Sequence, residues 1–136
     1  MAGVEVLIRI VENQTLSFGN YKLEEKAKKS DFEFKGDLYK VKTCKEITKL
    51  EKNGMFVYES VPGTAVNNFD VTNDGLTFDV ETVTDTQITV ELEEGTEYVM
   101  YIDGVNTGSM STKLGGKMSL SVPASNGMTA IKIVKE

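Results

Sequence analysis

The chain has no histidine and no tryptophan, a single cysteine, Cys44, and a single arginine, Arg9. Without histidine there is no imidazole base, no Ser-His or Cys-His nucleophile pair and no zinc site that uses imidazole. One cysteine cannot build a cysteine-rich metal site, and no glycine-rich phosphate-binding loop occurs. We therefore expect no cofactor, and carboxylates are the only side chains left that could act as catalysts.

The single cysteine also excludes an internal disulfide, so the sequence does not require an oxidising compartment. Residues 1–11 lack the basic start and the long apolar run of a signal peptide. No stretch approaches the roughly 20 apolar residues that a membrane-spanning helix needs. We expect a cytoplasmic protein that does not bind a membrane.

Charge is unevenly distributed along the chain. Residues 1–58 carry a net charge of +2 and residues 59–136 a net charge of −8, which gives −6 in total. An acidic half repels a phosphate backbone, and the lysines of the first half alternate with acidic residues. We expect no nucleic-acid partner.

Apolar and polar residues alternate along most of the chain, with the period of two that is typical of strands. This alternation occurs in the ranges 4–10, 31–35, 38–43, 76–81, 88–92, 118–122 and 131–133. Asn53-Gly54, Asp74-Gly75 and Asp103-Gly104 favour hairpin turns because these residues accept positive φ. The pattern predicts one domain over residues 1–136: an antiparallel β-sandwich, or a barrel-like variant of it, with about 11–12 strands.

Two segments do not fit this alternation. Residues 23–30 are charged and are interpreted as a helical turn or a loop. In Lys45–Lys52, Ile47 and Leu50 lie three residues apart, as in a helix, but Asn53-Gly54 leads straight into the apolar residues 55–58. We favour a strand over Lys45–Lys52, with a helix as the alternative, and expect at most one short helix in the protein.

The segment 98–102 is apolar on both of its faces, with Val99 and Tyr101 on one of them. The second face of such a strand needs cover. A loop or helix of the same chain could supply it, and so could a second subunit; on the latter ground we predict a homodimer.

Carboxylates are concentrated between residues 70 and 85. Asp70, Asp79, Glu81 and Asp85 are the residues from which a glycosidase-like pair could be drawn. Asp70, Asp74, Gly75 and Glu81 also have the spacing of a calcium-binding loop, although Thr72 replaces the expected oxygen ligand at the third position. Because strand patterns flank the motif, it does not predict an EF-hand. We interpret it as a hairpin turn, with a looser calcium site on Asp70, Asp74 and Glu81 as the alternative.

Sugar binding is the other candidate function. β-Sandwich modules bind carbohydrate on exposed aromatic rings next to Asp, Asn and Gln side chains. With tryptophan absent, Tyr21, Tyr39 and Tyr58 are the candidate ligand-binding residues, although each of them also fits a position in the core.

Several stretches of the chain resemble a group of small uncharacterised proteins of anaerobic gut bacteria, some of which carry the label endosialidase. The likeness rests on SFGNY at 17–21, KKSDF at 28–32, GDLYKVKT at 36–43, EITKLEKNG at 46–54 and VYES at 57–60. It implies a carbohydrate-active hydrolase. The family of sialidases, however, binds the sialic carboxylate with three arginines, where this chain has one, and only residues 72–78 resemble an Asp-box.

The last third of the chain, residues 92–122, resembles the accessory β-sandwich modules of bacterial polysaccharide-active enzymes. The likeness rests on a strand, the Asp103-Gly104 turn, a second strand, the Gly115-Gly116 turn and a third strand. It implies carbohydrate binding or packing. The sequence thus predicts a non-catalytic binding or structural module for a carbohydrate or a protein partner, with a hydrolase that uses paired carboxylates as the alternative.

Overall fold

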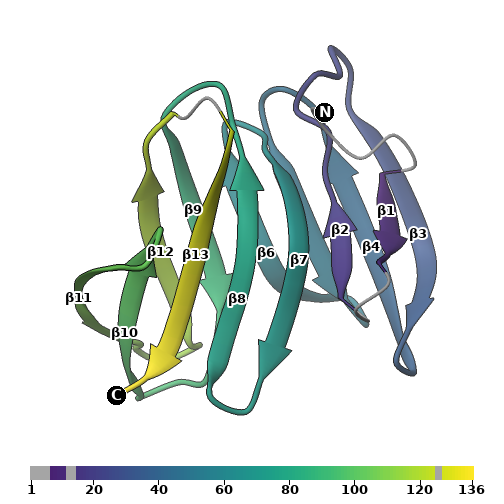
Figure 1. Ribbon diagram of the computed structural model, residues 1–136. Helices are drawn as coiled ribbons and strands as arrows, with labels where there is room; N and C mark the ends of the chain where they lie inside the picture. The colour runs from purple at the N-terminus through teal and green to yellow at the C-terminus, as the bar shows by residue number, and fades with distance from the viewer. Residues whose placement is uncertain (1–6, 12–14, 125–126) are drawn as a thin grey trace.

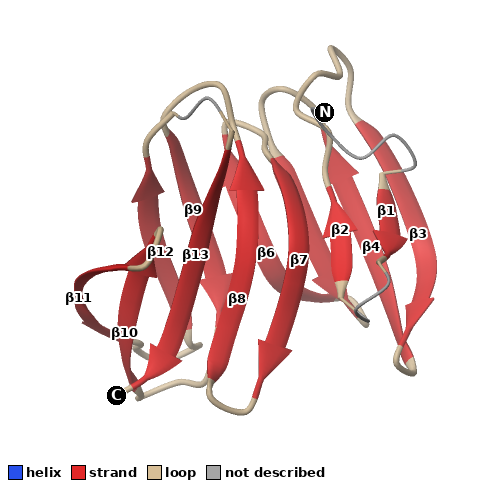
Figure 2. Ribbon diagram, in the orientation of Figure 1, coloured by secondary structure: helices blue, strands red, loops and turns tan. Residues whose placement is uncertain are grey.

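A computed structural model of the protein describes residues 7–11, 15–124 and 127–136. These residues form thirteen strands and no helix (Figure 2). The strands make two antiparallel sheets that pack face to face (Figure 1). The predicted all-β sandwich is confirmed, with slightly more strands than expected. The barrel-like variant is wrong, because each sheet ends in two edge strands in the described part of the chain.

The seven-stranded sheet has the order β1-β2-β7-β8-β13-β10-β11, and the six-stranded sheet has the order β12-β9-β6-β5-β4-β3. The strands of the first are β1 (Ile8–Ile10), β2 (Leu16–Phe18), β7 (Ala65–Thr72), β8 (Gly75–Glu81), β13 (Met128–Lys135), β10 (Glu97–Ile102) and β11 (Val105–Ser111). Those of the second are β12 (Lys117–Val122), β9 (Thr86–Glu91), β6 (Met55–Val61), β5 (Thr48–Lys52), β4 (Asp37–Thr43) and β3 (Ala27–Phe34). No helix in the described residues has the length and apolar character needed to cross a membrane.

The structure decides both ambiguous segments. The strand interpretation of Lys45–Lys52 is confirmed, because β5 covers Thr48–Lys52. The helical-turn or loop interpretation of residues 23–30 is wrong for its second half, because β3 begins at Ala27. β3 is an edge strand whose residues 28–31 are all exposed, so the apolar alternation that marks a half-buried strand is missing there. The start of the predicted strand over 4–10 lies outside the described residues.

Two of the three predicted hairpin turns have the expected geometry. Asn53-Gly54 and Asp103-Gly104 both have positive φ at each residue, as a two-residue type I′ turn requires. At the third, the chain reverses at Asn73 and Asp74, because Thr72 pairs with Gly75. Gly75 therefore begins β8, with a φ of 151° and the backbone of β13 close beside it.

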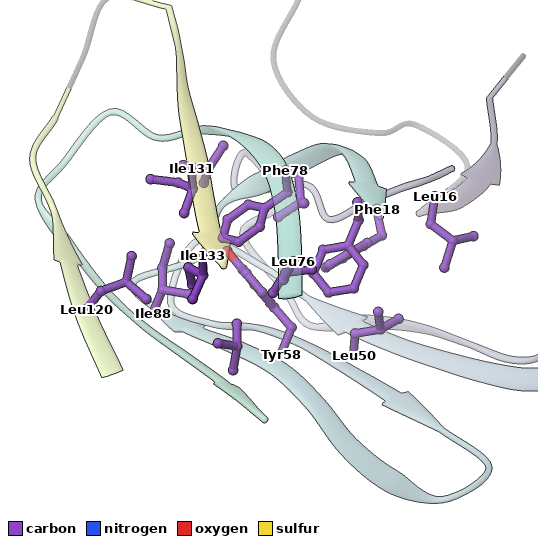
Figure 3. Close-up of a cluster of buried hydrophobic side chains, with 14 of the residues drawn as sticks. Leu16, Phe18, Leu50, Tyr58, Leu76, Phe78, Ile88, Leu120, Ile131 and Ile133 are labelled. Carbon is purple, nitrogen blue, oxygen red and sulfur yellow. The ribbon is translucent and has the colours of Figure 1, made fainter. Parts of the chain in front are cut away.

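The core lies between the inward faces of the two sheets. Alternate residues of β8, β13, β9 and β12 are buried, as the period-two pattern predicts. Tyr58 of β6 lies among the aromatic rings of Phe18, Phe69 and Phe78. Figure 3 labels Tyr58, Phe18 and Phe78 in this part of the core. All three rings meet Tyr58 nearly edge to face, which is a favoured arrangement for aromatic pairs.

A cluster of buried hydroxyl groups lies next to this aromatic core. The phenol of Tyr58 and the hydroxyl of Ser60 lie 2.8 and 2.9 Å from Oγ1 of Thr64. Thr48 donates its hydroxyl to the carbonyl of Thr64 at 3.0 Å and lies 2.8 Å from Oγ1 of Thr43. These groups satisfy one another, so the hydroxyls can be buried without the cost of an unpaired polar atom.

Candidate functional site

The three candidate tyrosines lie in three different places. Tyr58 is fully buried, with 0% of its side chain exposed, so its prediction as a surface ligand-binding residue is wrong. The alternation of β6 already allowed a core position, and the rings of the opposite sheet occupy the space around Tyr58. Burial raises the pKa of its phenol, because the phenolate would lose its hydration.

Tyr21 lines a hollow at one end of the sandwich. The hollow has a volume of about 620 Å³, and Val61, Pro62 and Val83 supply apolar surface to it. Val61 and Val83 are exposed, and burial followed by the nearby carboxylate of Glu81 raises the pKa of Tyr21. Tyr21 thus contributes one wall of an apolar surface hollow and has no exposed ring face of its own.

Tyr39 lies at the other end of the sandwich, where two hollows meet between the sheets. Tyr39, Lys52, Phe69 and Val71 line both, with volumes of about 190 and 340 Å³. Burial, and after it the carboxylate of Asp37, raises the pKa of Tyr39. Tyr39 is half-buried, so the ring has an accessible part, but Asp37 and Lys52 pair at 4.0 Å beside it.

The three candidate calcium ligands are not brought together. Asp74 lies in the turn that precedes β8, whereas Glu81 is the last residue of β8. Seven residues in an extended strand, at about 3.3 Å per residue, separate the two by roughly 20 Å. In the part of the chain that the structure describes, no three Asp, Glu, Cys or His side chains are close enough together to hold a metal ion.

We expect calcium to leave the melting temperature of the protein unchanged at millimolar concentration. The physical reason is that Asp74 and Glu81 lie at opposite ends of β8 and cannot bind the same ion. Thermal denaturation with and without calcium, with magnesium as the control ion, measures this. A rise in melting temperature that is specific to calcium and lost in Asp70→Asn would contradict it.

The carboxylates considered for catalysis do not face each other across a closed cleft. Asp79 and Glu81 are alternate residues of β8 and point to the same side of the sheet. Asp70 lies on β7, and Asp85, in the loop after β8, accepts a hydrogen bond from the backbone N–H of Ala124 at 2.9 Å. A glycosidase needs one carboxylate on each side of the sugar. This arrangement puts Asp70, Asp79 and Glu81 on one open face.

That open face contains a hollow which the sequence did not reveal. It lies on the outer face of the seven-stranded sheet and has a volume of about 530 Å³. We call it the outer-face hollow; its lining residues are Asn68, Thr77, Phe78, Asp79, Tyr101, Gly104, Ala130, Ile131 and Lys132. They come from β7, β8, β13 and β10 and from the turn after β10.

The strand register explains how these residues meet. Tyr101 of β10 lies opposite Lys132 of β13, and Lys132 lies opposite Thr77 of β8. The ammonium group of Lys132 is 5.8 Å from the centre of the Tyr101 ring, within cation–π range. In the next row Ala130 lies opposite Asp79, and its short side chain leaves the space that forms the hollow.

A bulge in β7 turns Asn68 toward Asp79. The register between β7 and β8 shifts between Asn67 and Asp70, and Asn68 has a φ of 56°. Its amide donates a hydrogen bond to the carboxylate of Asp79 at 2.9 Å. Bulges often re-aim a side chain beside a functional site. The hollow therefore combines an aromatic ring with carboxylate, amide, hydroxyl and ammonium groups.

Sequence reasoning missed Tyr101, Asn68 and Lys132 as site residues. One signal was available, because the segment 98–102 is apolar on both faces and Tyr101 belongs to the face that points away from Tyr98. The position of Asn68 could not be found in this way, since the bulge that directs its side chain follows no sequence pattern.

No model of a known protein family, no curated protein and no solved structure matches this chain. The resemblances to proteins labelled endosialidase and to accessory modules therefore stay predictions.

Proposed function

We propose that this protein is a non-catalytic carbohydrate-binding module and that the outer-face hollow is its binding surface. The observation that carries the proposal is the half-exposed ring of Tyr101 beside Asp79, Asn68 and Lys132 in an open hollow of about 530 Å³. The C–H face of a sugar packs on an aromatic ring. Sugar hydroxyls both donate and accept hydrogen bonds, and these three polar side chains offer both partners.

The charges around the hollow favour a neutral sugar chain. Its lining has one carboxylate, Asp79, and one ammonium group, Lys132. The single arginine, Arg9, lies in β1, with β2, β7, β8 and β13 between it and the strand of Tyr101. An acidic glycan such as a sialic-acid polymer would meet a chain of net charge −6 and a hollow whose lining residues include no arginine.

The alternative is a hydrolase that uses paired carboxylates, as the label endosialidase implies. The position of Asp79 and Glu81 on one side of one strand argues against it. A cytoplasmic location is part of the proposal and is supported by Cys44, a buried free thiol.

The proposal predicts that Tyr101→Ala weakens binding to the best glycan at least tenfold, or by about 1.4 kcal/mol. A glycan array identifies the ligand, and calorimetry compares the affinities of the wild type and the variant. Phe56→Ala is the matched control, because Phe56 is also half-exposed and has an ammonium group, that of Lys117, 4.6 Å from its ring centre, but lies on the other sheet.

Three results would contradict the proposal. Release of new reducing ends from the bound glycan would make the protein a hydrolase. Equal losses in Tyr101→Ala and Phe56→Ala would move binding away from the outer-face hollow. No binding to any glycan would favour a protein partner, and the apolar hollow at Tyr21, Val61 and Val83 would then be the first surface to test.

A further inference from the structure

The outer-face hollow is longer across the strands than along them. Its lining residues lie on β7, β8, β13 and β10, which are neighbours in the sheet and are drawn side by side in Figure 1. Neighbouring strands lie about 4.8 Å apart, so the hollow extends roughly 14 Å from β7 to β10. Along β8 and β13 the lining covers only residues 77–79 and 130–132, or roughly 7 Å of each strand. The hollow is therefore elongated and crosses four strands.

Polar side chains occur on every strand that the hollow crosses. From one end to the other these are Tyr101 on β10, Lys132 on β13, Asp79 and Thr77 on β8, and Asn68 on β7. The amide of Asn68 donates to Oδ2 of Asp79 and so orients that carboxylate. Within the described residues, neither Oδ1 of Asp79 nor the hydroxyl of Thr77 or Tyr101 has a hydrogen-bond partner. These atoms are available to a ligand, at intervals that the strand spacing sets.

Tyr101 gives one end of the hollow an apolar surface. Its ring is half-exposed, and the ammonium group of Lys132, 5.8 Å from the ring centre, is near the limit of about 6 Å for a cation–π contact. Lys132 is itself exposed, so its ammonium group can turn from the ring toward a ligand hydroxyl. A sugar ring can thus pack on Tyr101 while the next rings of the same chain meet the polar side chains farther along the hollow.

A sugar chain whose rings are joined through equatorial bonds is extended. Each ring lengthens such a chain by about 5 Å, which is close to the spacing of neighbouring strands. When the chain is laid across a sheet, successive rings therefore lie on successive strands. A chain with an axial bond at each linkage coils instead, so its rings turn away from the sheet.

We infer that the hollow binds an extended chain of about three or four neutral sugar rings, joined through equatorial bonds and laid across the strands from β10 to β7. The first ring packs on Tyr101, and the following rings form hydrogen bonds with Lys132, Thr77 and Asp79. Ala130 lies beneath the middle of this path, where its short side chain lets the chain pass. The inference rests on the proposed sugar binding and adds to it the shape, linkage and length of the ligand.

Calorimetry with two series of oligosaccharides tests the inference. One series consists of β-1,4-linked oligomers of glucose, mannose or xylose with one to six rings, and the other of α-1,4-linked glucose oligomers of the same lengths. Affinity for a β-1,4-linked series is expected to rise at least about tenfold from one ring to four and then to stay constant, because further rings lie outside the hollow. The α-1,4-linked oligomers, which coil, are expected to bind at least about tenfold more weakly at equal length.

Ala130→Leu tests the path of the chain without removing a polar group. A leucine there fills the middle of the hollow, so chains of three or more rings are expected to lose at least about tenfold in affinity, and the rise with chain length disappears. Ser119→Leu is the matched control and is expected to bind as the wild type does. Ser119 is also exposed on the outer side of its strand, but in the other sheet. Thermal denaturation verifies that both variants fold.

Three results would overturn the inference and leave the proposed sugar binding in place. These are equal affinity for one ring and for four, equal or tighter binding of the α-1,4-linked series, and a folded Ala130→Leu variant that binds as the wild type does. If Ala130→Leu does not fold, the two series on the wild type still decide. Binding of none of these oligomers, while another glycan binds through Tyr101, would also overturn the inference alone. Binding of no glycan at all would overturn the proposed function with it.

Discussion

Replacing Tyr58 by alanine is expected to lower the free energy of unfolding by about 3–5 kcal/mol, the range found when large buried aromatic residues are truncated. The ring centre of Tyr58 lies 5.2 Å from that of Phe18, 5.8 Å from that of Phe78 and 6.1 Å from that of Phe69, so removal opens a cavity in the middle of the core. Urea denaturation followed by circular dichroism measures the change.

Tyr58→Phe is the matched control for this prediction. It keeps the ring and removes only the hydroxyl, which lies 2.8 Å from Oγ1 of Thr64. Thr64 retains Ser60 as a partner at 2.9 Å, so the expected loss is about 1 kcal/mol. A loss in Tyr58→Ala that is no larger than the loss in Tyr58→Phe would show that the ring does not fill the core.

Gly75→Ala is expected to destabilise the protein by about 3 kcal/mol or more, since backbone strain and overpacking each cost roughly 1–3 kcal/mol. A Cβ atom at Gly75 would overlap the carbonyl oxygen of Ile133, which is backbone and cannot move aside as a flexible side chain could. The φ of 151° is also unfavourable for alanine. The midpoint of urea denaturation measures the loss.

Gly54→Ala separates the two causes. Gly54 also has a positive φ, 80°, but no atom lies within 4 Å of an added Cβ. Only the conformational cost of about 1–2 kcal/mol is expected there. Equal losses at Gly54 and Gly75 would mean that the strands β8 and β13 separate readily to admit a methyl group.

The tyrosines show which features of the candidate site could be predicted from the sequence and which could not. The sequence pattern predicted strands at Tyr39, Tyr58 and Tyr101, but a strand residue can point either into the core or toward solvent. Tyr58 lies opposite the buried Val90 and therefore points into the core. Tyr101 lies opposite Lys132, whose side chain is on the outer face of its sheet, and therefore points outward. The direction of each tyrosine side chain is thus set by the pairing register between strands that are distant in the sequence.

The carboxylates show that sequence spacing alone also does not predict how far apart two side chains lie. The spacing of Asp70, Asp74 and Glu81 matched a calcium loop, in which the chain curls around the ion. Here β8 is extended, so the same spacing holds Asp74 and Glu81 far apart, while Asn68 and Asp79 come within 2.9 Å across two strands. The extended backbone, and not the number of residues between ligands, set these distances.

By itself the sequence determined the all-β class, most strands and the hairpins at Asn53-Gly54 and Asp103-Gly104, because alternation and positive-φ turn residues act within a few neighbouring positions. It also determined that imidazole chemistry is absent. Only the tertiary structure decided which sheet each strand joins, which face of Tyr101 is open and which edges stay unpaired. These features depend on contacts between residues far apart in the chain, such as the pairing of β13 with β8 and β10, which no local pattern encodes.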